Sequence, residues 1–160
     1  SYSFPTERRQ ISNYIYDTLK NEEPELIKKY NLIPFEMSVQ CINRTLADKI
    51  FAVCDYYLQG KAQRNSRHLY DIFKLLNYVE IDEEFVELMM VREHRKTVGE
   101  KIAPAANENV DILQLAREIY DSRFYENDYH NTTENIISDE IDYSIVIERY
   151  IQVVKELFEK

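Results

Sequence analysis

Glycine is scarce in this chain, and that scarcity limits the folds open to it. Gly60 and Gly99 are the only glycines among 160 residues, and proline occurs four times. Thirteen tyrosines and seven phenylalanines supply large apolar side chains instead. Folds made of many short strands need frequent turn residues, so this composition favours long elements with few tight turns. We therefore expect a helix-dominated fold.

The bulk properties describe a globular protein without a membrane segment. Hydrophobic residues make up 44% of the chain and charged residues 31%. No apolar run approaches the roughly 18 residues of a membrane span, and no signal peptide opens the sequence. Cys41 and Cys54 stand alone, without the neighbouring His or Cys residues of a zinc site, and fit a reducing compartment. The sequence therefore predicts a cytoplasmic protein with no membrane partner.

The charge distribution limits binding to nucleic acid without excluding a local site. A net charge of −9 disfavours general binding to a polyanion. Basic residues nevertheless gather within 61–74 and again within 92–96. Such runs are usually a solvated face, but two of them could meet one polyanion. An RNA-binding domain that uses both patches is one alternative, and its affinity would fall steeply with salt.

The first quarter of the chain carries the strand signals. Residues 34–42 alternate apolar and polar side chains, which is the pattern of a half-buried strand. Residues 1–6 also suggest the end of a strand, and 7–10 a polar approach to a helix at 11–19. After residue 42 helical patterns follow, apart from a polar, Asn-rich surface loop at 126–135 and a last helix from Asp139.

These patterns predict an α+β fold that is mostly α. A small antiparallel strand portion at the N-terminal end should pack on a C-terminal helical bundle. The expected domains are 1–42, which holds the strands, and 43–160, a compact helical unit.

Two helical patterns between Asn43 and Leu76 each carry a charge near an apolar stripe. The first stripe repeats at helical spacing, with Lys49 on the same face, and consists of Leu46, Ile50, Val53 and Tyr57. Arg67 and Asp71 flank the second stripe, which consists of Leu69, Ile72, Phe73 and Leu76. A short turn at 59–65 carries Gly60, Lys61 and Arg64. We expect an antiparallel helical hairpin that brings Lys49 and Asp71 to opposite walls of one cleft.

Each of these charges also has an ordinary structural explanation. Arg67 and Asp71 have the i, i+4 spacing of a solvated helix salt bridge, which contributes about 0.3 kcal/mol. Lys49 can lay its stem on apolar surface and keep its ammonium in water. Spacing alone leaves these interpretations open.

A resemblance to a known family is carried by the run RTLADKIFAVCDYYLQGKAQRNSRHLYDIFKLL. It resembles the C-terminal signature of AbiEii/AbiGii-type nucleotidyltransferase toxins, which belong to the polymerase-β-like superfamily. That signature is a TLxEKLxAL helix followed by an RDxYDLxxL helix. The pieces FPTERRQISNYIYDTL and PFEMSVQ resemble the same family, so the likeness covers residues 3–76 well. It implies that Lys49 and Asp71 are catalytic, with Arg67, the first residue of the second motif, beside them.

One family motif is missing from the sequence. Members hold nucleotide and metal with a Gly-Ser step followed by two aspartates, whereas here Lys61 follows Gly60 and Glu100 follows Gly99. The chain also opens at Ser1 rather than at Met. We therefore expect a C-terminal part of a nucleotidyltransferase that is inactive alone, with 1–42 a remnant of the transferase sheet. The ligands of the expected Mg²⁺ would lie mostly outside this chain.

The resemblance also implies substrates and partners. A nucleoside triphosphate would bind through Lys49, with Arg67, Arg64 and Lys61 as further phosphate-binding residues. Asp71 could orient Lys49, act as a base, or contact metal or sugar. An RNA acceptor and a cognate antitoxin protein would be the partners of such a toxin. The alternative is a non-catalytic helical module for binding protein or RNA, in which Lys49 and Asp71 form a structural pair.

Overall fold

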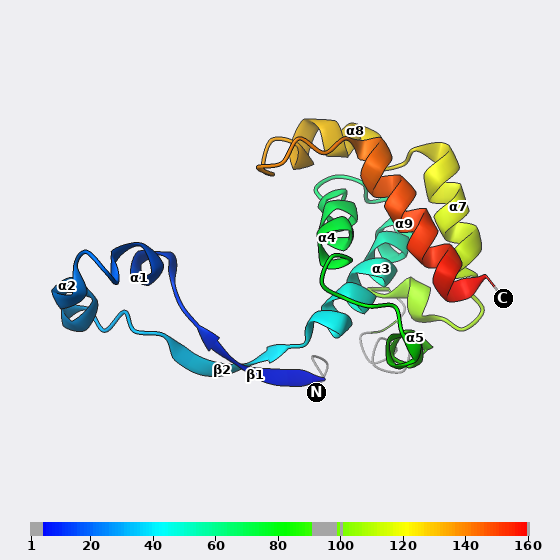
Figure 1. The fold of residues 1–160 in the computed structure, drawn as a ribbon. Helices are drawn as coiled ribbons and strands as arrows, with labels where there is room; N and C mark the ends of the chain where they lie inside the picture. Colours follow the sequence, from blue (N-terminus) through cyan, green and yellow to red (C-terminus); the bar gives the residue numbers. More distant parts are fainter. Residues whose placement is uncertain (1–4, 91–98, 100, 160) are drawn as a thin grey trace. The chain divides into compact units, whose positions relative to one another are not determined.

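The computed structural model describes residues 5–90, 99 and 101–159, and the chain divides into two compact units between Cys41 and Ile42. Helices dominate, and a two-stranded antiparallel sheet lies near the N-terminus. The predicted class, α+β with a helical majority, is confirmed. Figure 1 shows the order of the elements along the chain.

The N-terminal unit is a long β-ribbon with two short helices between its strands. Strand β1 (Thr6–Ile11) pairs antiparallel with β2 (Phe35–Gln40), and Ile11 lies opposite Phe35. Helices α1 (Tyr14–Leu19) and α2 (Pro24–Lys29) follow β1 (Figure 1). Asn13 caps α1, since its side chain accepts a hydrogen bond from the Tyr16 N–H.

The strand predicted at 34–42 is confirmed as β2, whereas the prediction for 7–10 is wrong. These residues form most of β1 rather than an approach to a helix, because the backbone ladder to β2 fixes a strand whose own side chains are mostly polar. The strand end expected at residues 1–6 falls largely outside the described residues. Among the described residues of this unit Ile27 alone is buried, while Phe35 and Met37 are exposed.

The second unit is built from helices around one apolar core. Its α-helices are α3 (Ile42–Leu58), α4 (Arg67–Leu75), α5 (Glu83–Met90), α7 (Ile112–Ser122), α8 (Glu126–Asp128) and α9 (Tyr143–Phe158). A 3₁₀ turn η1 (Pro104–Ala106) and a π-helical turn η2 (Tyr129–Thr133) join them. The helices converge on fully buried side chains that include Leu46, Ile50, Leu69, Ile72, Phe85, Ile119 and Tyr150. Most of the predicted α3 stripe is in this core.

The prediction of a surface loop at 126–135 is wrong, because this segment forms α8 and η2. Tyr129 is fully buried there and its hydroxyl donates to the Ile141 carbonyl. Asp128 is buried as well. The last helix begins at Tyr143 rather than at Asp139, since the Asp142 side chain accepts from the Ser144 N–H and caps α9. Within the described residues, no helix has the length and apolar character needed to cross a membrane.

Candidate functional site

Helices α3 and α4 bring the two predicted catalytic side chains into contact. Leu46 and Ile50 of α3 and Leu69 of α4 are fully buried in the same core, which holds the two helices together. The turn between them uses a left-handed backbone at Gly60, where φ is 66°. On another face of this pair, Lys49 Nζ lies 2.6 Å from Asp71 Oδ2. The contact joins residues 22 positions apart and is too short to include a water molecule.

His68 is the third member of this cluster. Its Nδ1 lies 3.2 Å from Lys49 Nζ. The His68 ring also stacks on Tyr56, with centroids 5.4 Å apart and planes 2° from parallel. Burial of the ring, reinforced by the Lys49 ammonium, lowers the pKa of His68 from 6.5 to about 4. His68 is therefore neutral near pH 7 and, contrary to what its place among the basic residues within 61–74 predicts, adds no charge to them.

The cluster lies at the protein surface. The Lys49 side chain is 27% exposed and that of Asp71 36%. A lysine ammonium has three N–H donors, and Asp71 and His68 account for two of them. Lys49 has no other hydrogen-bond partner in the part of the chain that the structure describes. One donor is therefore available to a ligand.

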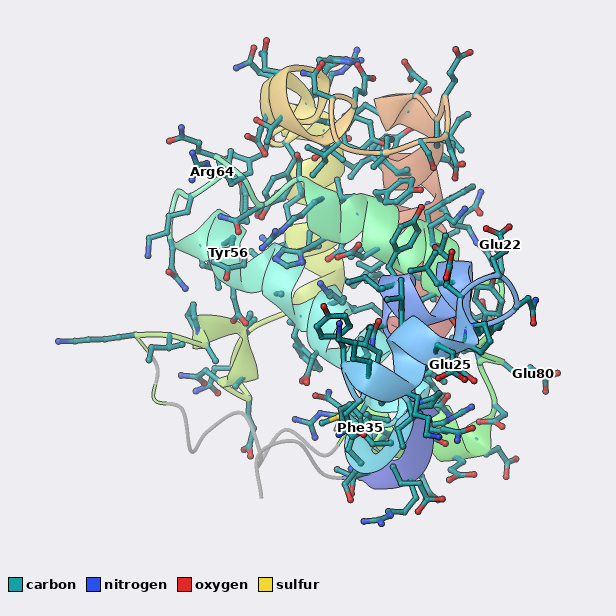
Figure 2. The ribbon with its side chains drawn as sticks, turned by 90° about the vertical axis from the view of Figure 1, so that its left-hand side faces the viewer. Glu22, Glu25, Phe35, Tyr56, Arg64 and Glu80 are labelled. Carbon is teal, nitrogen blue, oxygen red and sulfur yellow. The ribbon has the colours of Figure 1, made fainter. Side chains whose placement is uncertain are left out.

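The structure places the other predicted cations around this cluster rather than in it. Arg67 is exposed at the start of α4, close enough for its charge to disfavour protonation of His68. Arg64 projects from the loop between α3 and α4 (Figure 2), and Lys61 Nζ donates to Gln59 Oε1 at 2.8 Å. Within residues 5–90 and 101–159, neither arginine side chain has a hydrogen-bond or ion-pair partner. The ordinary salt bridge between Arg67 and Asp71 is thus not formed.

A buried carboxylate from α8 holds the start of α4. Asp128 accepts from the backbone N–H groups of Arg64 at 2.8 Å and Ser66 at 3.1 Å, and from the Ser66 hydroxyl at 2.6 Å. Burial alone would raise the pKa of Asp128, but hydrogen bonds led by that of Ser66 outweigh it and lower the pKa. Asp128 therefore fixes the backbone just before α4. Sequence reasoning missed Asp128 because its partners lie more than 60 positions away.

The described residues do not fit a divalent cation. They contain no group of three or more His, Cys, Asp or Glu side chains that could hold a metal ion. Asp71 directs one carboxylate oxygen at an ammonium rather than toward a second acid. The basic patch at 92–96 lies outside the described residues.

The sequence contains a signal for His68 that could have singled it out. The motif of the second helix reads RDxYDLxxL in the resembling family, and this chain reads RHLYDIFKL. His68 therefore stands where that motif has an aspartate.

Comparison with known protein families supplies one match. Residues 1–156 match the family model described as nucleotidyl transferase AbiEii toxin, type IV TA system. Searches of curated proteins and of solved structures gave no significant match. The match extends well past residues 3–76, where the motifs lie, and takes in the helices up to α9.

Proposed function

Because this chain belongs to the AbiEii nucleotidyltransferase toxin family of type IV toxin–antitoxin systems, we propose that Lys49 and Asp71 form one wall of a nucleotide site. The observation that carries this proposal is that Lys49 and Asp71, the two residues that match the helical motifs of the family, lie in direct contact at 2.6 Å. Nucleotidyl transfer needs the negative charge of a triphosphate to be offset while a hydroxyl attacks the α-phosphate and pyrophosphate leaves. A lysine ammonium with a free donor meets that need.

The geometry favours an orienting role for Asp71. Its Oδ2 accepts from Lys49 and fixes the direction of the ammonium. The described residues form no group of three or more metal-ligating side chains that would give it a role in metal binding. Asp71 is therefore a positioning residue for Lys49 in this proposal.

The exposed cations extend the same wall. Arg67 and Arg64 each present a planar guanidinium without a protein partner, which suits two-point contact with phosphate oxygens. Lys61 is held by Gln59 and supplies a point charge farther along the loop. A triphosphate bound at Lys49, or the backbone of an RNA acceptor bound there, would extend to these residues.

The chain by itself should bind phosphate weakly and not catalyse transfer. Its sequence has no Gly-Ser step, and its described residues form no site for the Mg²⁺ that such enzymes use. We expect the metal ligands to come from outside this chain, and residues 1–42 to belong to the sheet region of the transferase. A cognate antitoxin is the protein partner that the toxin family implies.

A structural ion pair is the competing explanation, and the partial exposure of both side chains limits what such a pair can add to stability. Ion pairs at a solvated surface contribute about 0 to 1 kcal/mol, so Lys49 and Asp71 would be a weak structural device. A fully buried ion pair would contribute more to structure, because the loss of one partner would leave an unpaired charge in the core. Lys49 and Asp71 are not buried in this way.

A titration followed by NMR tests the proposal. The ¹⁵N-labelled chain is titrated with ATP, GTP, CTP and UTP at millimolar concentrations, with and without Mg²⁺. We expect saturable shifts at Lys49, Arg67 and Asp71. Saturable shifts confined to other residues, or none with any nucleotide, would overturn the assignment.

A further inference from the structure

His68 has a hydrogen-bonding state that its neighbours dictate. An ammonium can only donate, so the contact with Lys49 Nζ at 3.2 Å makes Nδ1 the acceptor. A neutral imidazole carries one proton, which must then sit on Nε2. Stacking on Tyr56 holds the ring in this orientation. Lys49 and Tyr56 together therefore fix both the tautomer and the direction of the ring.

The resulting Nε2–H donor is open to a ligand. Among the described residues, Nε2 of His68 has no hydrogen-bond partner. Nε2 is also accessible to solvent. In the described part of the chain, the only buried side-chain N or O atom without a hydrogen-bond partner is the Tyr143 hydroxyl, so the unpaired Nε2 of His68 is not a buried atom. A donor that is accessible and unpaired, beside a lysine with a free N–H, forms part of an anion-binding surface.

The charges that face His68 keep it a donor rather than a base. Lys49 of α3 and Arg67 of α4 disfavour a proton on Nδ1, and Asp71 of α4 acts in the opposite sense. Burial favours the neutral ring, and the pKa of about 4 lies far below neutral pH. As long as Lys49 is charged, Nδ1 stays occupied as an acceptor and Nε2 stays protonated.

We propose that His68 is a phosphate-binding residue of this site, which donates its Nε2–H to a phosphate oxygen while its Nδ1 positions the Lys49 ammonium. The proposal rests on the function proposed above and adds a second donor to it. The phosphate oxygen belongs to the triphosphate of a nucleotide or to the backbone of an RNA acceptor, which offer the same chemistry.

The tautomer can be measured without any activity. The chain has three histidines, so the ring ¹⁵N signals of His68 are identified by their loss in His68→Asn. We expect Nε2 protonated and Nδ1 unprotonated at pH 7 in the free chain. Protonation of Nδ1, or of both nitrogens, would overturn the inference and leave the assignment of Lys49 untouched.

Two substitutions then distinguish the roles of the two ring nitrogens. In His68→Gln the amide nitrogen lies near the place of Nε2 and keeps a donor there. In His68→Asn the side chain reaches only the place of Nδ1, so it can accept from Lys49 but offers no donor at Nε2. With inorganic pyrophosphate as the probe, we expect His68→Asn to bind about tenfold more weakly and His68→Gln to stay within about threefold of the unchanged chain.

The outcomes distinguish this inference from the function on which it rests. Unchanged binding by His68→Asn, with binding lost in Lys49→Met, would overturn the role of His68 alone. No pyrophosphate binding by the unchanged chain would overturn both. A short single-stranded RNA is titrated in parallel to identify the source of the phosphate. Of the two ligands, pyrophosphate and RNA, the one whose affinity falls more in His68→Asn is the one whose oxygen Nε2–H contacts.

Discussion

Two lysine–aspartate pairs contact helix α4, and they are nearly identical in length. Lys49 lies 2.6 Å from Asp71, and Lys74 lies 2.7 Å from Asp139. Their aspartates are exposed to almost the same degree, 36% and 37%. Distance and exposure therefore do not distinguish a candidate site from an ordinary surface ion pair.

The surroundings of the two pairs differ. Asp139 also accepts from the Tyr70 hydroxyl at 3.0 Å, and its hydrogen bonds, led by that from Lys74, lower its pKa. That pair fastens the segment before α9 onto α4. Lys49 instead contacts a neutral, buried His68 whose outer nitrogen has no partner among the described residues. The Lys49 pair therefore has a second, unpaired donor beside it, whereas the acid of the Lys74 pair is also bound to a tyrosine hydroxyl.

The largest effect on stability is expected at Asp128, which holds the backbone just before α4, near the end of the helix that carries His68 and Asp71. Asp128→Ala leaves the backbone N–H groups of Arg64 and Ser66 without their acceptor, and the Ser66 hydroxyl keeps only Thr133 as a partner among the described residues. Unfolding should therefore become easier by about 3 to 4 kcal/mol. Urea unfolding measures the change, with the exposed Asp121→Ala as the matched control. Hydrogen exchange should quicken at the start of α4 and not near Lys74. Equal stability of the two variants would contradict the role of Asp128.

His68 should make the free energy of unfolding depend on pH. Its pKa is about 4 when folded and 6.5 in the unfolded chain, so between these values only the unfolded state takes up the proton. Stability should therefore fall by up to about 3 kcal/mol as the pH drops from about 6.5 to about 4. His68→Asn removes this part of the acid sensitivity, whereas substitution of the exposed His130 should not. An unchanged pH profile in His68→Asn would show that the ring is not held neutral.

A smaller effect on phosphate binding is expected at Arg67. Arg67→Gln removes an unpaired guanidinium beside the cluster and should weaken pyrophosphate binding about threefold to fivefold. Arg149 is also exposed and without a partner among the described residues, but it lies on α9, so Arg149→Gln serves as the control. Equal losses in both variants would indicate a general charge effect rather than a site.

The smallest effect is expected at Lys74. Lys74→Met breaks a solvated ion pair, so Tm should fall by only about 1 to 2 °C, and salt should reduce the difference. Thermal melting at low and high salt measures it. A much larger fall would mean that this pair holds α4 more firmly than its exposure suggests.

Local patterns predicted the framework of the site. The 3.6-residue repeats of α3 and α4 and the alternation in β2 are properties of the sequence, and they placed Lys49 and Asp71 on neighbouring helices. These elements are held in place by apolar side chains whose spacing can be read directly from the sequence.

Features that depend on distant partners were missed. Strand β1 is polar and takes its conformation from the ladder to β2. Asp128 reads as part of a polar loop until its bonds to Arg64 and Ser66, more than 60 positions away, are known. His68 counts among the basic residues within 61–74 until its burial and the position of Lys49, which make it neutral, are known.

A comparison of the two lysines under one condition tests directly whether Lys49 belongs to a binding site. Pyrophosphate and ATP are titrated into the unchanged chain, Lys49→Met and Lys74→Met, and binding is followed by NMR, with Tm measured on each sample. We expect Lys49→Met to bind at least about tenfold more weakly with Tm nearly unchanged, and Lys74→Met to bind normally. Equal binding by both variants would contradict this expectation and leave Lys49 and Asp71 as a second structural pair on α4.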